Sequence, residues 1–406
     1  MSQTNAGKMA QSSENVEGLT SETTRLGEYL RRLREGYGYT LRKVEERAMA
    51  LGEAIDNSQL SRFEKGKAVP SFDKLRALAR VFNVPVQNFS DVLDLEEYQP
   101  FKPTSVVHAE LLRDGADWMA RGEHGRAFVT YERAFDLAER EGDPVRAAEL
   151  AAEARWRMAT ALKALGKLYM TERELRAILK DRKKLAPHTR IRVLLQLSYL
   201  YRELGDYYLA SVLARECLEL AEGAGDRLTQ AGVLNTLGNI AHDEEEPVTA
   251  LDIYNRALDV LQHLDGHHEM KATVLTNLGG CHVTVGRFDE GIALLREAHS
   301  LARDRGFRRS AALSLTRMAE AHMARNEHGQ ARQILEESDL LANRTGDCYY
   351  DMLFLNAHHR WKMAQREEHP TREKIAFGRL RHLRSMLQRR FPEVEEFDQH
   401  IERIRR

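Results

Sequence analysis

Small residues that recur about every 40 residues constrain the fold of this chain most strongly. Glycines follow Ala- and Leu-rich helical segments at this interval, at Gly225, Gly266, Gly306 and Gly346, and Gly142 lies two intervals before the first of them. A glycine just past the end of a helix adopts the left-handed conformation that stops it. A helical unit of this size cannot bury its apolar face alone, so successive units must stack. The pattern predicts an array of paired helices, and an irregular helical bundle is the less favoured reading.

A second set of positions runs in phase with the first and marks the turn inside each unit: Gly122, Gly166, Gly205, Glu245, Gly286 and Asn326. A small residue precedes each turn and a larger one usually follows it, as Gly238 and Tyr254 do around Glu245. This spacing resembles the tetratricopeptide repeat, whose usual period is about 34 residues. We expect a tetratricopeptide-like α-solenoid over residues 106–390, with six to seven repeats of about 40 residues, and a capping helix over 391–406.

Residues 23–89 show a different pattern, with four short helical segments in a row. Thr40 and Asp56 are candidate N-caps of the second and third segments, because a short polar side chain there accepts a hydrogen bond from the first turn. Leu60 and Phe63 form the apolar face of the third segment. The expected core residues of the fourth segment are Phe72, Leu75, Leu78 and Phe82.

The stretch SRFEKGKAVPSFDKLRALARVFNVP resembles the phage-repressor (Xre-type) helix-turn-helix domain, and its tail of Glu64, Gly66, Pro70 and Ser71 is the most specific part. In that family the third helix enters the major groove of DNA. The resemblance implies that bases are read by Asn57, Ser58, Ser61 and Arg62, and that phosphates are bound by Arg42, Lys43, Lys65 and Lys67. It also implies that Glu64 holds an arginine of the first helix, which we expect to be Arg34.

One departure from the family lies between Val44 and Leu60, where the chain has about five extra residues. They lengthen either the second helix or the turn after it. The first residue of the third helix is therefore left open, and Arg62 is the best placed of the four base-reading candidates.

Charge is distributed unevenly along the chain. The whole sequence carries 61 Lys and Arg against 62 Asp and Glu, a net charge of −1. Residues 25–85 hold 13 Lys and Arg against 8 Asp and Glu, a net of +5, so the rest of the chain carries −6. A locally basic domain is typical of proteins that bind DNA phosphates.

The first helices of stacked repeats line a concave groove, and polar residues at their exposed positions are candidates to bind an effector. These are Tyr199, Arg202, Asn235, Asn239, His242, Thr276, Thr316 and Glu320. Asn235 and Asn239 lie one turn apart, so their amides suit the backbone of an extended peptide. The combination of an Xre-type domain with long repeats resembles the Rap/Rgg/NprR/PlcR/PrgX group of peptide-responsive regulators. That resemblance implies a homodimer whose solenoid senses a peptide or protein effector.

These patterns favour a cytoplasmic, sequence-specific transcriptional regulator that binds double-stranded DNA. The alternative is a repeat scaffold that sequesters a partner, with a vestigial or protein-binding head. Residues 1–22 are expected to be a disordered leader and residues 90–105 a linker. No apolar stretch is long enough for a membrane span. Because no catalytic arrangement, phosphate loop or metal-ligand spacing is evident, we expect neither enzymatic activity nor a cofactor or metal.

Overall fold

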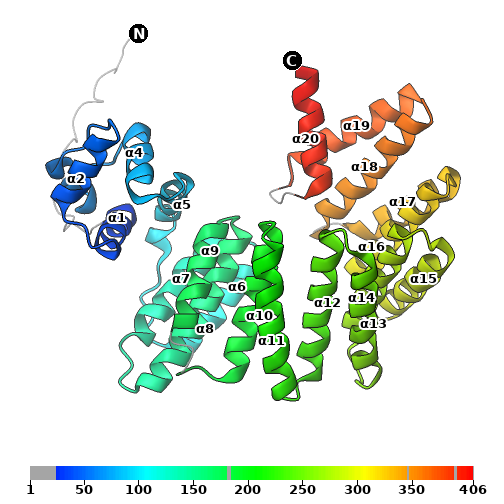
Figure 1. Ribbon diagram of the computed structural model, residues 1–406, viewed down its shortest axis with the longest axis horizontal. Coiled ribbons are helices and arrows are strands. Elements are labelled where there is room, and N and C mark those ends of the chain that lie inside the picture. The colour runs from blue at the N-terminus through cyan, green and yellow to red at the C-terminus, as the bar shows by residue number, and fades with distance from the viewer. Residues whose placement is uncertain (1–23, 181–183, 345–346, 388–390, 406) are drawn as a thin grey trace, which may run out of the picture. The chain divides into compact units, whose positions relative to one another are not determined.

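The computed structural model describes residues 24–180, 184–344, 347–387 and 391–405, so the expected leader lies outside the described residues. The described part is built of helices (Figure 1), which confirms the all-α prediction. One short antiparallel pair is present there, between β1 (Asn343–Arg344) and β2 (Asp347–Cys348). The chain divides into two compact units, Met1–Leu137 with Thr160–Thr171, and Ala138–Ala159 with Glu172–Arg406. Each is described by itself below.

The first unit begins with the helical head. Its helices are α1 (Arg25–Gly36), α2 (Leu41–Ala50), α3 (Asn57–Glu64), α4 (Phe72–Phe82), α5 (Gln87–Glu96) and the 3₁₀ turn η1 (Gln99–Phe101). The Thr40 side chain accepts a hydrogen bond from the backbone N–H of Lys43, and Asp56 accepts one from Gln59, so both predicted N-caps are confirmed. Leu30, Val44, Leu60, Leu78 and Phe82 are fully or almost fully buried and form the centre of the head.

One expected core residue of the head is exposed. Phe72 is 66% exposed, whereas Leu75, Leu78 and Phe82 of the same helix are buried. Phe72 is the first residue of α4, directly after the N-cap Ser71. The helical period places Phe72 on the apolar face, but the helix begins beyond the edge of the core, and no residue that the structure describes buries this side chain.

The rest of the first unit docks directly against the head. It contains α6 (His108–Ala120), most of α7 (His124–Ala138), the end of α8 (Pro144–Ala164) and the start of α9 (Leu168–Lys180). Arg25 of α1 forms two hydrogen bonds to the Glu132 carboxylate of α7, at 2.5 and 2.9 Å. Lys167 binds Asp94 at 2.8 Å and Asp91 at 3.4 Å, and both Lys167 and Asp91 are buried. We call these two sets of ion pairs the clasp.

The second unit continues the repeat pattern to the C-terminus. After the remaining parts of α8 and α9 come α10 (Pro187–Glu203), α11 (Tyr207–Gly223), α12 (Arg227–Asp243), α13 (Pro247–Gln262), α14 (His268–Thr284), α15 (Phe288–Asp304), α16 (Arg308–Ala324), α17 (His328–Ala342), α18 (Tyr350–Arg366), α19 (Pro370–Arg384) and α20 (Pro392–Arg405). From α10 to α19 each helix contacts the next one. The alternate helices α10, α12, α14, α16 and α18 also contact one another in order, as stacked repeats require.

The turns inside the repeats have the backbone conformation that the sequence indicates. All six turn positions have positive φ, including the two that are not glycine, Glu245 at 61° and Asn326 at 60°. Glu368, between α18 and α19, has φ of 51° and marks one more turn of the same kind. A positive φ is unfavourable for residues with a Cβ atom, so Glu245 holds its turn at a cost.

Small residues let the paired helices approach. A Cβ atom on Gly238 would lie 2.5 Å from the ring of Tyr254, which is itself 2% exposed. Gly115 meets Tyr131 in the same way in the first repeat. The sequence pairing of a small residue before the turn with a large one after it is therefore a direct packing contact.

The last helix packs across the preceding pair. Val394 and Phe397 of α20 are buried against α18 and α19, where Phe397 contacts the rings of Phe354 and Trp361 edge to face. Arg384 of α19 adds a bidentate ion pair to Asp398 at 2.9 and 3.1 Å. The start of α20 thereby lies beside the first helices of the last repeats.

Candidate nucleic-acid interface and repeat groove

Helix α3 presents a polar face to solvent and an apolar face to the head. Leu60 and Phe63 are buried, whereas Asn57, Ser58 and Arg62 are exposed and Ser61 is half-buried. The four predicted base-reading residues therefore lie on one short helix with side chains accessible to a partner. Gln59, which the sequence analysis did not include among the base readers, is also exposed on α3 and is a further candidate.

The residues that this chain has in excess of the usual helix-turn-helix domain lie in the turn before α3. Helix α2 ends at Ala50, and residues 51–56 form an extended turn in which Gly52 has φ of 75°. Ile55 is 2% exposed and anchors this turn in the core of the head. The structure thus places Asn57 at the first position of α3, immediately after its N-cap Asp56.

A buried ion pair fixes α3 to α1. Arg34 Nε and Nη2 donate to the two carboxylate oxygens of Glu64 at 2.7 and 2.9 Å, which confirms the expected pairing. Arg34 Nη1 also donates to the carbonyl oxygen of Tyr39 at 3.1 Å. The hydrogen bond that Arg34 donates to Glu64 raises the pKa of Arg34, so the guanidinium remains charged. A bidentate pair of this kind sets the orientation of α3 as well as its position.

The predicted phosphate-binding residues surround α3 at the surface. Arg42 and Lys43 both lie near Glu46, at 3.5 and 3.2 Å, and all three are exposed. Lys65 and Lys67 are exposed, and they form no ion pair within the described residues, as is also true of Arg62. Three cations without an ion partner in the described residues therefore lie at or just after the end of α3.

A groove of about 480 Å³ lies along the first helices of the repeats in the second unit. Helices α10, α12, α14, α16 and α18 and the start of α20 contribute to its lining. Five of the predicted effector residues lie there: Arg202, Asn239, His242, Thr316 and Glu320. Lining residues that the sequence did not single out include Asn277, Arg309, Arg317, Asp351 and Glu393. The residue one repeat after Asn235 is Thr276, and Asn277 is the next residue along α14, so the period alone does not indicate it.

The other three predicted groove residues do not line this cavity. Tyr199 is half-buried, Asn235 is 7% exposed and Thr276 is 1% exposed. Asn235 accepts a hydrogen bond from the Asn277 amide at 2.9 Å, which places it behind the surface. Thr276 bonds to Ser314 at 2.8 Å inside the stack. Thr316 contributes to the lining but is 1% exposed and donates to Asn356 at 2.8 Å.

Each arginine in the groove is already paired with a carboxylate of the groove. Arg202 binds Asp243 at 2.6 Å, Arg309 binds Asp351 at 3.1 Å and Arg317 binds Glu320 at 2.9 Å. Burial alone would raise the pKa of Glu320, but Arg317 and His359 outweigh it and bring that pKa to about 2. Burial lowers the pKa of His242, and nearby Arg317 adds to this effect. The groove is thus a polar surface whose charges largely compensate one another.

The described residues give little support for a metal site, a membrane span or a nucleophilic cysteine. No three metal-ligating side chains gather there, and no helix of that part is long and apolar enough to cross a membrane. Cys217 and Cys281 are buried thiols, and burial raises their pKa values to about 12 and about 11. Neither thiol has the lowered pKa of a nucleophilic cysteine.

Comparison with protein families agrees with this architecture. The helix-turn-helix family model matches residues 30–89, and the tetratricopeptide repeat model matches residues 189–263 and 229–304. The chain therefore carries an Xre-type helix-turn-helix domain followed by tetratricopeptide repeats. Both are non-enzymatic kinds of domain. A sequence search of curated proteins gives no match.

Solved structures with similar folds include members of the group that the sequence resembles. The apo form of RapI aligns with a TM-score of 0.56 at 11% identity, covering 68% of this chain and 97% of that chain. A Rap protein complexed with competence and sporulation factor aligns with a TM-score of 0.52 at 15% identity, covering 89% and 98%. Bacillus thuringiensis PlcR in complex with the peptide PapR7 and DNA covers 82% and 97% at 16% identity. Its TM-score is 0.32, so no conclusion about this chain rests on it.

Proposed function

We propose that this chain is a sequence-specific, DNA-binding transcriptional regulator of the cytoplasm. The observation that carries the proposal is the exposed polar face of α3, which holds Asn57, Ser58 and Arg62 in front of a buried apolar face. Lys65 and Lys67, which have no ion partner among the residues that the structure describes, supply positive charge beside it. In helix-turn-helix proteins such a helix reads base edges while flanking cations bind phosphates.

We further propose that the repeat groove binds a peptide or protein effector and that the chain acts as a homodimer. A 480 Å³ cavity is in the range of ligand sites, and its lining presents amides and compensated ion pairs. The Rap neighbour was solved with a bound factor, which supports a ligand in the corresponding repeats. Two heads in a dimer would contact half-sites about one helical turn of DNA apart. Under this proposal residues 23–89 are the head, 90–105 the connection and 106–390 the sensor.

The test is a selection of duplex DNA from a random pool by the purified protein. We expect one enriched sequence whose affinity falls steeply with salt. Arg62→Ala should cost about 1–3 kcal/mol and relax selection at one base position, because a guanidinium that contacts a base edge is lost. Lys67→Ala should instead weaken binding to all sequences and reduce the salt slope by about 1.

Failure of this experiment is easy to recognise. If no sequence is enriched, or if Arg62→Ala and Lys67→Ala have the same uniform effect, the regulator proposal is wrong. A repeat scaffold with a vestigial head would enrich no DNA sequence at all.

A further inference from the structure

The turn between α2 and α3 is held in place at both of its ends. Gly52 ends α2 in the left-handed conformation, with φ of 75°, and the N–H of Glu53 donates to the carbonyl oxygen of Ala48 at 2.9 Å. This hydrogen bond is typical of a helix that stops at a glycine. At the other end Asp56 caps α3. We call residues 51–56 the anchored turn.

Two cations of α4 hold the middle of the anchored turn. Lys74 is half-buried, and its Nζ donates to the carbonyl oxygen of Ala54. Arg80 Nη1 lies 2.9 Å from Glu53 Oε1. Lys74 and Arg80 are each three residues from Ala77, so the three lie on one side of α4, and Ala77 is 1% exposed. That side of α4 therefore faces the anchored turn.

Helix α3 is thus fixed at its two ends by different partners. Its last residue, Glu64, is bonded to Arg34 of α1, whereas its first residue, Asn57, directly follows the anchored turn. Ser58 lies at the same end as Asn57, and Arg62 lies two residues before Glu64. Release of the anchored turn should therefore displace Asn57 and Ser58 more than Arg62.

We propose that Lys74 and Arg80 are positioning residues for the reading of DNA: through the anchored turn they set where Asn57 and Ser58 meet the base edges. A binding residue has to be held to within about 0.5 Å of its productive position, so a released turn loses discrimination at the bases that these two residues contact. The base that Arg62 contacts is still read. This inference rests on the regulator proposal and adds a function for the turn that the usual domain lacks.

Direct binding of DNA phosphates is the alternative role of the two cations, and Glu53 distinguishes the roles. Glu53 is an acid, so its removal adds positive charge and by electrostatics alone strengthens binding to every DNA sequence. As the partner of Arg80 it holds the turn, and its removal then weakens discrimination between sequences. The two roles therefore predict opposite consequences of one substitution.

The experiment measures, at one salt concentration, the affinity of the full chain for its selected DNA sequence and for every single-base variant of that sequence. Asn57→Ala, Ser58→Ala and Arg62→Ala first identify the base positions that these residues read. We expect Glu53→Gln and Lys74→Met each to lower discrimination about tenfold at the positions assigned to Asn57 or Ser58, and to leave the Arg62 position within about twofold of the natural chain.

Arg80→Gln and Arg76→Gln form a matched pair, because each removes one arginine charge from the exposed surface of α4. Arg80 is bonded to the anchored turn, whereas Arg76 lies 3.6 Å from Asp73 of its own helix. Only Arg80→Gln should lower discrimination. Hydrogen exchange in the first turn of α3, measured without DNA, should also accelerate in Arg80→Gln alone, and thermal unfolding checks that both variants are folded.

A double-mutant cycle tests whether Glu53 acts through the base readers. In a chain that already carries Asn57→Ala and Ser58→Ala, Glu53→Gln should have no further effect on discrimination, because the residues that the turn positions are gone. A further loss of the same size as in the natural chain would mean that the anchored turn acts on DNA by another route.

Three other results would overturn the proposal. They are unchanged discrimination in Glu53→Gln and Lys74→Met, stronger binding of Glu53→Gln to all sequences with discrimination retained, and equal effects of Arg76→Gln and Arg80→Gln. Enrichment of no sequence by the natural chain would instead refute the regulator proposal, and this one with it. The natural chain shows that outcome before any variant is compared, so the two failures are distinct.

Discussion

Glu64 shows how much one buried side chain fixes in the head. Its carboxylate is 5% exposed and holds Arg34 through two hydrogen bonds. Glu64→Ala leaves the partly buried Arg34 guanidinium with its hydrogen bond to the Tyr39 carbonyl oxygen but without its carboxylate partner, so we expect the free energy of unfolding of the head to fall by about 2 kcal/mol. Amide hydrogen exchange of α1 and α3 in the full chain measures this.

The matched control is Glu46→Ala, since Glu46 also contacts two cations but at an exposed site. Its cost should stay below about 0.5 kcal/mol. Equal effects of the two substitutions would mean that the Arg34–Glu64 pair does not set the position of α3.

His358 gives the stability of the last repeats a specific pH dependence. Its pKa is lowered from 6.5 to about 4 by burial, with His359 and Lys362 acting in the same direction and Glu396 opposing them. The unfolded chain therefore binds this proton more tightly than the folded chain. The contribution of the neutral His358 ring to the free energy of unfolding is fully present above about pH 6.5 and is lost as the pH drops towards 4. The loss is at most about 3 kcal/mol.

His358→Gln should flatten that part of the pH profile, as measured by urea unfolding at a series of pH values. His267→Gln is the control, because His267 is exposed at the start of α14. A slope between pH 4 and 6.5 that is the same in both variants would contradict the assignment to His358.

Glu245 lies at a repeat turn whose stability a substitution could increase. It holds φ of 61° between α12 and α13, a position where most other repeats have glycine. Glu245→Gly should stabilise the protein by about 1 kcal/mol, because the unfavourable left-handed conformation of a residue with a Cβ atom is relieved. Glu244→Gly, at φ of −78°, should instead destabilise it by about 0.5–1 kcal/mol. Urea unfolding compares the two, and a loss of stability in Glu245→Gly would refute the argument.

The repeats were predictable from sequence because their signals are local. A left-handed turn and a small residue facing a large one recur within each 40-residue unit, and the structure confirms both at Glu245 and at Gly238 with Tyr254. The recognition helix was predictable for the same reason, since Asp56 caps it and Leu60 and Phe63 bury one face. Phe72 was placed wrongly because periodicity reports a helix face and not where the core ends.

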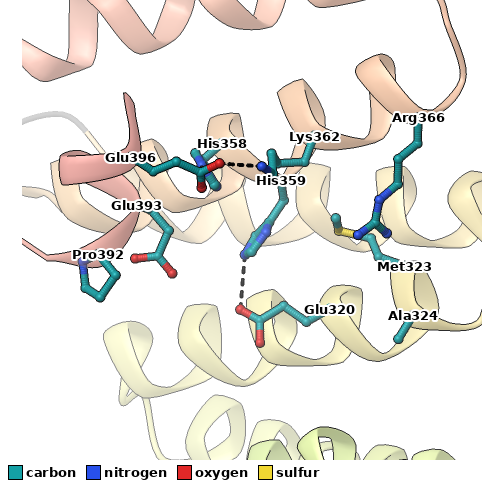
Figure 2. A pocket seen from close by; sticks show the side chains of 10 residues that line it. All are labelled: Glu320, Met323, Ala324, His358, His359, Lys362, Arg366, Pro392, Glu393 and Glu396. Atoms are coloured by element: carbon teal, nitrogen blue, oxygen red, sulfur yellow. Dashed lines mark hydrogen bonds and ion pairs between the residues drawn. The ribbon is translucent and has the colours of Figure 1, made fainter. Parts of the chain in front are cut away.

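The features that the sequence did not predict depend on contacts between distant parts of the chain. Glu393 reaches the groove (Figure 2) because α20 packs over α18 and α19; the sequence predicts a capping helix over residues 391–406 but not which helices it covers. Asn235 and Thr276 lie on the expected helices, yet hydrogen bonds to neighbouring repeats hold them inside. Asp91 and Lys167 are 76 residues apart and meet through the docking of the head.

Considered as a whole, the first unit should unfold as one body because the clasp joins the head to the repeats. Among the described residues, Lys167→Met leaves the buried Asp91 with a side-chain hydrogen bond from Gln87 alone, so we expect the docking of the head to weaken by about 3 kcal/mol. Hydrogen exchange should then accelerate in α5 and in the helices it supports. Lys180→Met removes an exposed lysine at the end of α9, the helix that begins directly after Lys167, and should have little effect. Unchanged exchange in Lys167→Met would show that the clasp does not couple the two parts.

The clasp also determines where this molecule can be cut and rejoined. Its members come from distant elements: Arg25 from α1, Asp91 from α5, and Glu132 and Lys167 from the first two repeats. A chimera that receives a foreign DNA-binding head at Ser105 would keep Glu132 and Lys167 but lose their partners. A chimera joined after Thr171 would carry the whole clasp with its head. Exchange of heads between related proteins should therefore succeed at junctions inside the second repeat and fail at the apparent linker.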